Sequence, residues 1–208
     1  MLYKKRIGIL GGTFNPIHAG HLIMAEEVCK CHYLAKVIFV PTNIPPHKYT
    51  EDLADTHHRY QMVKEAISGN AKFAASDMEI RREGKSYTID TVQEIRHSSK
   101  EDSEIYLIMG ADSLEELEIW KDVKKLSRLC HFIIVNRPGH STQVSNRLTD
   151  AIGKEKVLDI ERLKIEIEPV GVSSTEIRKR LKGGADINGL VPPCVDVYIR
   201  EHGLYSHS

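Results

Sequence analysis

Residues 8–22 read Gly8-Ile9-Leu10-Gly11-Gly12-Thr13-Phe14-Asn15-Pro16-Ile17-His18-Ala19-Gly20-His21-Leu22. The short apolar run 6–10 is bounded by glycine, which predicts a buried strand. The segment 11–16 predicts a sharp turn, because glycine permits positive φ and lets a ligand approach the backbone closely. Beyond residue 18 the apolar positions follow helical spacing to about residue 31. The free N–H groups at such a helix start form a natural seat for phosphate.

His18 and His21 are three positions apart, so they share one face of the first helical turn. An imidazole there can donate an N–H to a phosphate oxygen, and a protonated one also adds charge. Two alternatives are a zinc-binding pair, for which no third ligand stands at a suitable spacing, and surface histidines that fall near a helix cap. The glycines ahead of the pair favour the anion site.

The common nucleotide-binding fingerprints G-x-G-x-x-G and G-x-x-x-x-G-K-[ST] do not occur in the sequence. The pattern that does occur is G-G-T-F-x-P-x-H-x-G-H. It resembles the nucleotidyltransferase superfamily, and the resemblance implies that the H-x-G-H part binds the triphosphate of a nucleoside triphosphate.

The bulk composition bounds the class of protein. The 208 residues carry 29 basic and 29 acidic side chains, so the net charge favours neither nucleic acid nor a membrane surface as partner. A hydrophobic content of 41% fits one globular domain over residues 1–208. The four cysteines form no C-x-x-C, and the first apolar run is too short for a secretion signal. We therefore expect reduced thiols, a cytoplasmic protein and no membrane span.

Apolar runs alternate with helical patterns along the chain, which predicts an α/β fold. We expect a Rossmann-like, doubly wound, mainly parallel sheet with helices on both faces over residues 1–170, and a small C-terminal helical part over 171–208. Predicted strands cover 6–10, 36–40, 73–75, 78–80, 104–109, 131–135, 156–160 and 163–168. Predicted helices cover 20–31, 56–68 and 141–152, and others begin near 88, 173 and 192. Ligands of such folds bind outside the carboxyl ends of the strands.

Polar groups follow two of the predicted strands. The proline-rich segment 41–48 predicts a stiff, extended loop that ends in His47 and Lys48, which could contact phosphate. The alternative is a rigid surface loop with solvated cations. Asp112 follows the strand 104–109, where a carboxylate can accept hydrogen bonds from a ribose, or can cap a helix.

The segment Ser86-Tyr87-Thr88 leads into a helix with Thr88 as its expected N-cap, and this helix start is a second candidate anion seat. The alternative is an ordinary cap. Trp120 is the only tryptophan, in a charged stretch expected to be exposed. Its ring could stack on a flat ligand or serve only in packing.

A third helix start combines hydroxyls with a cation. Ser173 and Glu176 form a capping-box pattern, with Ser174 and Thr175 between them and Arg178 about one turn further on. Hydroxyls, free N–H groups and an arginine together suit a polyphosphate. The alternative is a well-capped amphipathic helix whose arginine faces water.

These motifs accumulate in one order: G-G-T-F-x-P-x-H-x-G-H, P-x-x-x-P-P-H-K, S-Y-T-x-x-T, G-A-D, a tryptophan, R-P-G, S-S-T-x-I-R and G-L-Y. Across nearly the whole chain this order resembles the bacterial nicotinate-nucleotide adenylyltransferase family. The resemblance implies transfer of the adenylyl group of ATP to nicotinate mononucleotide, which gives nicotinic acid adenine dinucleotide and pyrophosphate, a step of NAD biosynthesis. Asn15 departs from the family, which more often has Asp at this position to shape the turn.

The resemblance also implies roles for individual residues. The implied catalytic residues are His18, His21 and Arg178. The implied ATP-binding residues are Gly11, Gly12, Thr13, Phe14, His18, His21, Asp112, Ser173, Ser174, Thr175 and Arg178. The implied residues for nicotinate mononucleotide are Asn43, His47, Lys48, Tyr87, Thr88 and Trp120. Mg²⁺ would arrive on the ATP phosphates, with no metal site in the protein.

Several alternatives remain at this stage. Sister transferases that act on phosphopantetheine or use CTP share the phosphate motifs, but their acceptors would not explain Trp120 beside the S-Y-T helix start. A nucleotide-sensing module would not need the histidines or Arg178. A class I aminoacyl-tRNA synthetase fragment would carry a K-M-S-K-S-like loop. The expected partners are ATP and nicotinate mononucleotide, without nucleic acid or membrane, and a homo-oligomer is left open.

Overall fold

The computed structural model describes residues 4–44, 53–99, 103–136, 142–168 and 170–206. His47, Lys48 and the R-P-G segment at 137–139 lie outside the described residues.

Six parallel strands form one sheet in the order β3-β2-β1-β4-β5-β6. Their bounds are β1 (Lys5–Gly12), β2 (Lys36–Pro41), β3 (Phe73–Ala75), β4 (Ser103–Gly110), β5 (His131–Asn136) and β6 (Ile165–Glu166). The chain winds outward from β1 in one direction and then outward from β4 in the other. This 3-2-1-4-5-6 order is that of a doubly wound Rossmann-like sheet, whose ligands bind where the order reverses. The predicted fold class is confirmed.

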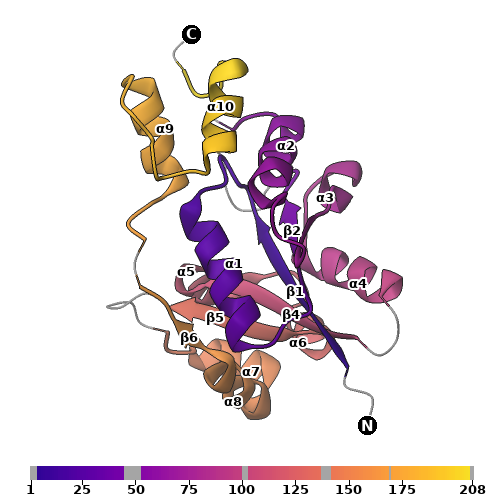
Figure 1. The fold of residues 1–208 in the computed structure, drawn as a ribbon. Helices are drawn as coiled ribbons and strands as arrows, with labels where there is room; N and C mark the ends of the chain where they lie inside the picture. The colour runs from indigo at the N-terminus through magenta and orange to yellow at the C-terminus, as the bar shows by residue number, and fades with distance from the viewer. Residues whose placement is uncertain (1–3, 45–52, 100–102, 137–141, 169, 207–208) are drawn as a thin grey trace.

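The helices occupy both sides of the sheet (Figure 1). They are α1 (Ala19–Cys31), α2 (Thr56–Ile67), α3 (Met78–Arg81), α4 (Thr88–Ser98), α5 (Ala111–Glu116), the 3₁₀ turn η1 (Leu117–Ile119), α6 (Val123–Leu129), α7 (Asn146–Ile152), α8 (Lys154–Leu163), α9 (Ser174–Lys182) and α10 (Pro193–Glu201).

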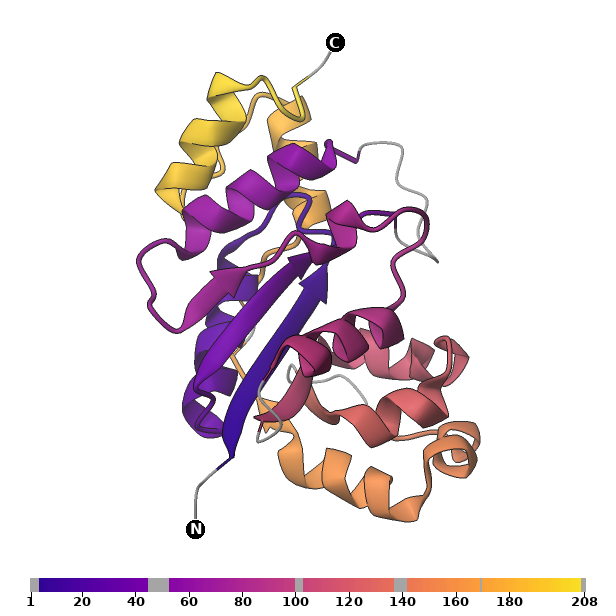
Figure 2. The same ribbon diagram turned by 90° about the vertical axis from the view of Figure 1, so that its right-hand side faces the viewer.

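Side chains alternate along the strands between two buried clusters. Leu10 of β1 belongs to the cluster with α1, α2, α9 and α10, whereas Ile9 belongs to the cluster with α4, α5 and α6. This period of two is what a strand buried on both faces requires. The C-terminal helices join the first cluster through Ile177, Val195 and Ile199, and α10 lies beside α2 (Figure 2).

Two of the predicted strands are wrong. Residues 78–80 lie in α3 and residues 156–160 lie in α8. In α8 Ile160 is buried while Leu158 is 69% exposed, so the apolar residues follow a helical stripe rather than a sheet face. The predicted helix 141–152 begins only at Asn146, where Ser145 caps it.

Three predicted helix caps are displaced by one or two residues. The carboxylate of Asp55, rather than Thr56, caps α2 by accepting the N–H of His57 at 2.8 Å. Tyr87, rather than Thr88, is the N-cap of α4. Gly110 is the N-cap of α5, so Asp112 lies inside the first turn of that helix. A carboxylate in a first turn still interacts favourably with the helix dipole.

Candidate active site

The carboxyl ends of β1, β2 and β4 border a cavity of about 360 Å³. Seven of the predicted site residues line it: Gly11, Gly12, Thr13, His21, Tyr87, Thr88 and Trp120. The cavity therefore reaches from the turn after β1 and the start of α1 to the start of α4. Its place agrees with the expectation that ligands of this sheet bind outside the strand ends.

Other predicted residues lie away from the lining of this cavity: His18, Phe14, Asn43, Asp112, Ser173, Ser174, Thr175 and Arg178. Asp112 is exposed on α5, where its neighbour Ser113 reaches the cavity instead. The roles of these residues toward a ligand stay predictions.

The two histidines stack at the start of α1. His18 is the N-cap residue, and its backbone N–H donates to Nδ1 of His21 at 3.2 Å. The two rings lie with their centroids 3.7 Å apart. A ring nitrogen that accepts a hydrogen bond carries no proton, so the N–H of neutral His21 is on Nε2. His21 thus holds Nδ1 against the backbone, and the residue lines the cavity.

The turn after β1 is packed tightly around Phe14. This side chain is only 1% exposed, its φ is 46°, and its ring lies edge-on to His21 with centroids 5.0 Å apart. A Cβ at Gly12 would lie 3.3 Å from the Phe14 ring, so glycine suits this close approach. Because the Phe14 ring is buried in the core, only its backbone is placed to meet a ligand.

Asn15 links the turn to three other parts of the chain. Its Oδ1 accepts the backbone N–H of Ala54 at 3.1 Å and the hydroxyl of Tyr205 at 2.7 Å. Its carbonyl accepts Nη1 of Arg178 at 2.8 Å. The side-chain oxygen acts as an acceptor, which the amide supplies as well as a carboxylate would. Asn15 therefore shapes the turn.

The start of α9 is docked on the same turn. Ser174 donates its hydroxyl to the carbonyl of Pro16 at 2.9 Å, beside the Arg178 bond to residue 15. Ser173 accepts the N–H of Glu176 at 3.2 Å, which confirms it as the cap. Glu176 pairs with Arg180 at 3.0 Å, so half of the predicted capping box forms. Nε of Arg178 is buried and has no hydrogen-bond partner among the described residues.

A fully buried arginine, which the sequence reasoning missed, holds together the segments that follow β1 and β2. Arg59 of α2 donates Nη1 to the carbonyls of Thr13 and Thr42, both at 2.7 Å. Its Nε reaches the carbonyl of Ala54 at 2.9 Å, and its Nη2 that of Asn43 at 3.3 Å. Burial lowers the pKa of Arg59, which Tyr205 and Asp55 partly oppose.

A sequence signal for Arg59 did exist. It falls in the apolar stripe of α2 with Met62, Val63 and Ile67, all of them buried. A cation on the apolar face of a helix must find partners inside the protein.

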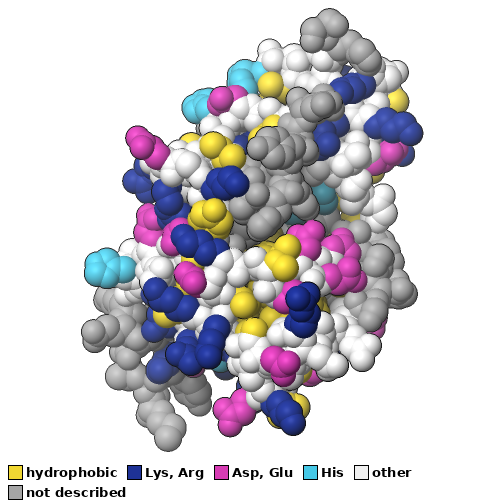
Figure 3. Space-filling model, turned by 180° about the vertical axis from the view of Figure 1, so that it is seen from behind, with side chains coloured by type: hydrophobic (Ala, Val, Ile, Leu, Met, Phe, Trp, Pro, Cys, Tyr) yellow, Lys and Arg dark blue, Asp and Glu magenta, His cyan; other side chains and the backbone are white. Residues whose placement is uncertain are grey.

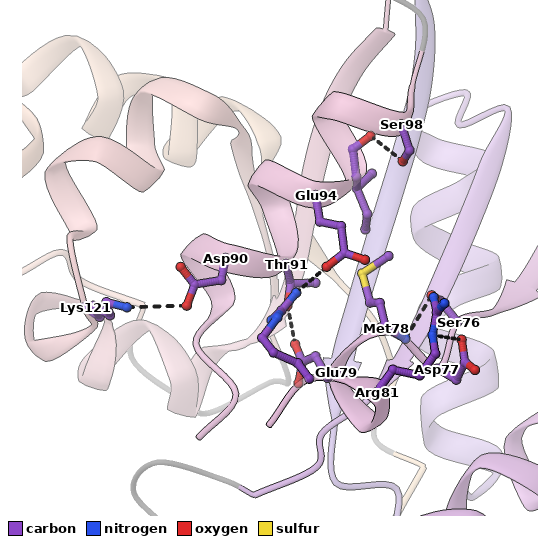
Figure 4. Close-up of polar contacts among 12 residues, drawn as sticks. Ser76, Asp77, Met78, Glu79, Arg81, Asp90, Thr91, Glu94, Ser98 and Lys121 are labelled. Carbon is purple, nitrogen blue, oxygen red and sulfur yellow. Dashed lines mark hydrogen bonds and ion pairs between the residues drawn. The ribbon is translucent and has the colours of Figure 1, made fainter. Parts of the chain in front are cut away.

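Glu79 is a second residue that the sequence reasoning missed. It is 6% exposed, lines the cavity and accepts the hydroxyl of Thr91 at 2.6 Å (Figure 4). Burial raises the pKa of its carboxyl, while hydrogen bonds from Thr91, Ser86 and Thr42 act against the rise. The sequence predicts a strand over residues 78–80, and that prediction does not place the Glu79 carboxylate next to α4.

The start of α4 is tied to the end of β2. The backbone N–H of Asn43 donates to the hydroxyl of Ser86 at 3.2 Å. The side-chain amide of Asn43 donates to the carbonyl of Arg82 at 3.2 Å. Asn43 therefore positions the loop before α4, and its side chain is directed to that loop rather than to the cavity.

Two aromatic side chains stand at the α4 end of the cavity. Tyr87 and Trp120 both line it, and both are partly buried against the second core cluster. Trp120 is thus less exposed than its charged surroundings suggested. Figure 3 shows hydrophobic side chains in the middle of the rear face of the molecule, with charged side chains of both signs around them.

Within the described ranges, no group of three or more His, Cys, Asp or Glu side chains is arranged to hold a metal ion. The same part of the chain contains no helix that is both long and apolar enough to cross a membrane.

A doubly wound parallel sheet, a tight turn that leads from the Gly11-Gly12 end of β1 to a histidine pair, and a cavity at the strand ends define an α/β protein of the nucleotide-binding class. The family model "Cytidylyltransferase-like" matches residues 9–180. A relative from Moorella thermoacetica is 45% identical over 201 residues, covering 96% of this chain and 91% of the relative. One from Synechococcus sp. (strain JA-3-3Ab) is 42% identical over 204 residues, covering 97% and 95%. Both are named "Probable nicotinate-nucleotide adenylyltransferase".

The chain belongs to the nicotinate-nucleotide adenylyltransferase family, within the cytidylyltransferase-like proteins. Among solved structures it is similar to the Plasmodium falciparum nicotinic acid mononucleotide adenylyltransferase complexed with NaAD. The TM-score is 0.74 at 22% identity, and the match covers 97% of each chain. This likeness supports the fold.

We expect Arg59→Met to lower the free energy of unfolding by about 3 kcal/mol or more. A buried acceptor without a partner costs ~1–3 kcal/mol, and Arg59 serves four carbonyls. Arg59→Lys should also destabilise, because an ammonium lacks the planar fork of donors. Urea unfolding measures both. Arg81→Met is the control, since its exposed pair with Asp77 should contribute under ~1 kcal/mol. Equal stability of the two methionine variants would contradict the role of Arg59.

The buried Glu79 carboxyl predicts a pH-dependent stability. Its pKa in the folded protein is raised, so its contribution is fully present below the unfolded pKa and is lost as pH rises through the folded pKa. Glu79→Gln imitates the protonated form. The free energy of unfolding of Glu79→Gln minus that of wild type should therefore rise from pH 4 to pH 8, as measured by urea unfolding. Exposed Glu83→Gln is the control. A difference that stays constant or falls with pH would refute this account.

Proposed function

We propose that this protein transfers the adenylyl group of ATP to nicotinate mononucleotide, with release of pyrophosphate and formation of nicotinic acid adenine dinucleotide, a step of NAD biosynthesis. One observation carries the proposal in a chain of this family. A single cavity joins the histidine-bearing start of α1 to the Tyr87, Thr88 and Trp120 end at α4. Such a cavity offers one end to phosphates and the other to a flat acidic ring.

In the proposed reaction the 5′-phosphate of nicotinate mononucleotide attacks the α-phosphorus of ATP. One P–O bond forms and the bond to pyrophosphate breaks. A phosphate monoester has a second pKa of about 6, so it is largely ionised at pH 7. The nucleophile therefore needs no general base. The task of the protein is to bring two anions together and to stabilise the charge that develops, and positioning alone can lower a barrier by up to ~7–11 kcal/mol.

The phosphate end is assigned to the start of α1. His21 would donate its Nε2–H to the reacting phosphates, and the backbone of Gly11, Gly12 and Thr13 would lie along them. His18, whose ring stacks on the ring of His21, would act on the phosphates at the same end of the cavity. Donors fixed in place before the reaction lose little free energy to reorganisation during it.

The start of α9 would complete the ATP side. Arg178 already holds the carbonyl of Asn15, and we assign its positive charge to the phosphates of ATP. Thr175 and the free N–H groups of α9 would assist, while Ser173 and Ser174 hold the helix start in place. Contacts of Asp112 with the ribose of ATP, and of His47 and Lys48 with phosphate, remain proposals from the sequence.

The acceptor end is assigned to the start of α4. The backbone N–H groups of Tyr87 and Thr88 would bind the pyridine carboxylate, and Trp120 would stack on the ring. Mg²⁺ is assigned to the substrate, as MgATP, where it would neutralise phosphate charge. Of the two carboxylates that line the cavity in the described part of the chain, Glu79 already accepts a hydrogen bond from Thr91. The cytoplasmic location and the expectation of no nucleic-acid partner remain predictions.

The proposed function is tested by pyrophosphate release with MgATP. The acceptors to compare are nicotinate mononucleotide, nicotinamide mononucleotide and phosphopantetheine, and CTP replaces ATP in a parallel series. We expect turnover with ATP and a marked preference for the nicotinate acid. Turnover only with phosphopantetheine, or only with CTP, would assign the protein to a sister activity.

We expect His21→Ala to lower kcat by about 10²–10³, the usual effect of removing one donor to a transition state. His18→Ala should act similarly, and its unfolding curve is measured as well because the His18 side chain is buried. His57→Ala on the exposed face of α2 is the control and should keep wild-type turnover. Wild-type turnover in His21→Ala would remove this residue from the mechanism.

A further inference from the structure

Lys121 stands at the acceptor end of the cavity and follows Trp120 directly. Among the described residues that line the cavity it is the only lysine or arginine, whereas Glu79 and Glu116 contribute two carboxylates. Among these described residues, an anionic ring bound there would therefore meet a single lysine or arginine side chain.

Two contacts hold the Lys121 ammonium beside the start of α4. Its Nζ lies 4.3 Å from the centroid of the Tyr87 ring and 3.3 Å from Oδ2 of Asp90. Tyr87 is the N-cap of α4, and Asp90 lies in its first turn. Figure 4 shows Lys121 reaching Asp90 on one side of α4, while Thr91 faces Glu79 on the other. The cation is thus positioned next to the N–H groups that are proposed to bind the carboxylate.

A backbone N–H group donates more strongly to a carboxylate than to an amide oxygen, but it carries no formal charge. Each ligand presents an oxygen that accepts a hydrogen bond from an N–H. A lysine ammonium differs, because it carries charge and has three donors but no acceptor. It attracts a carboxylate, whereas the NH₂ group of an amide, itself a donor, finds no acceptor on it. A positioned lysine therefore favours the acid and disfavours the amide.

We propose that Lys121 is a specificity-determining residue, whose ammonium pairs with the pyridine carboxylate of the acceptor and selects the acid over the amide. The inference rests on the proposed adenylyl transfer. Asp90 holds the ammonium when no acceptor is bound and competes for it when one is. Loss of Lys121 and loss of Asp90 should therefore move the acid-to-amide preference in opposite directions.

The experiment measures kcat/KM with MgATP for nicotinate mononucleotide and for nicotinamide mononucleotide. Lys121→Met keeps an aliphatic chain over Tyr87 and should lower the acid-to-amide ratio by about three- to fivefold, the size expected for a half-exposed ion pair. The fall in kcat/KM for the acid should come mainly from a higher KM. Lys121→Arg should keep the ratio, and Asp90→Asn should raise it.

Lys125→Met is the matched control, because Lys125 is exposed on α6 and does not line the cavity. An unchanged ratio in Lys121→Met, or an equal fall in Lys125→Met, would overturn the inference. If the wild-type protein prefers the acid in the same experiment, the proposed function stands even where the inference about Lys121 fails. A wild-type protein without turnover on either acceptor would overturn the function itself.

Discussion

The guanidinium of Arg59 is the interaction on which the geometry of the site depends. It lies fully buried in α2 and donates to carbonyls at the end of β2, in the turn after β1 and in the approach to α2. A buried charge is tolerated only when its donors are satisfied, so these backbone segments are held in one arrangement. Asn15 and Arg178 continue the same network to α9 and the C-terminal segment. The turn is thereby fixed from several directions before any ligand arrives.

Sheet topology explains why two helix starts face one cavity. In a parallel sheet the carboxyl ends of neighbouring strands lie along the same edge. At this edge β1 leads into the turn before α1, and β2 leads into the segment that contacts the loop before α4. The start of α1 brings His21, and the start of α4 brings Tyr87 and Thr88. Glu79, Ser86 and Asn43 set the position of α4 against β2. One cavity bordered by two helix starts suits the proposed reaction, in which the phosphates meet at the start of α1 while the pyridine ring lies at the start of α4.

The sequence predicts the order of strand, turn and helix from β1 to α1, because apolar runs and the spacing of His18 and His21 are local signals. The turn is expected from Gly11, but Gly11 and Gly12 still belong to β1. The sequence does not reveal the partners of Arg59 and Glu79, which lie up to 46 residues away and become neighbours only in the fold. The segments 78–80 and 156–160 were misassigned because short apolar runs fit either period. The hydroxyl and arginine motif at α9 is correctly placed at a helix start, but Ser174 and Arg178 also serve to dock that helix on the turn.

The most direct test of the account is a crystal structure of this protein with bound nicotinic acid adenine dinucleotide. We predict the two phosphates at the start of α1 beside His21, and the pyridine ring between Trp120 and the start of α4, with its carboxylate on the N–H groups of Tyr87 and Thr88. A dinucleotide bound in the reverse direction, with adenine against Trp120, or bound outside the cavity, would contradict the assignment of the two ends.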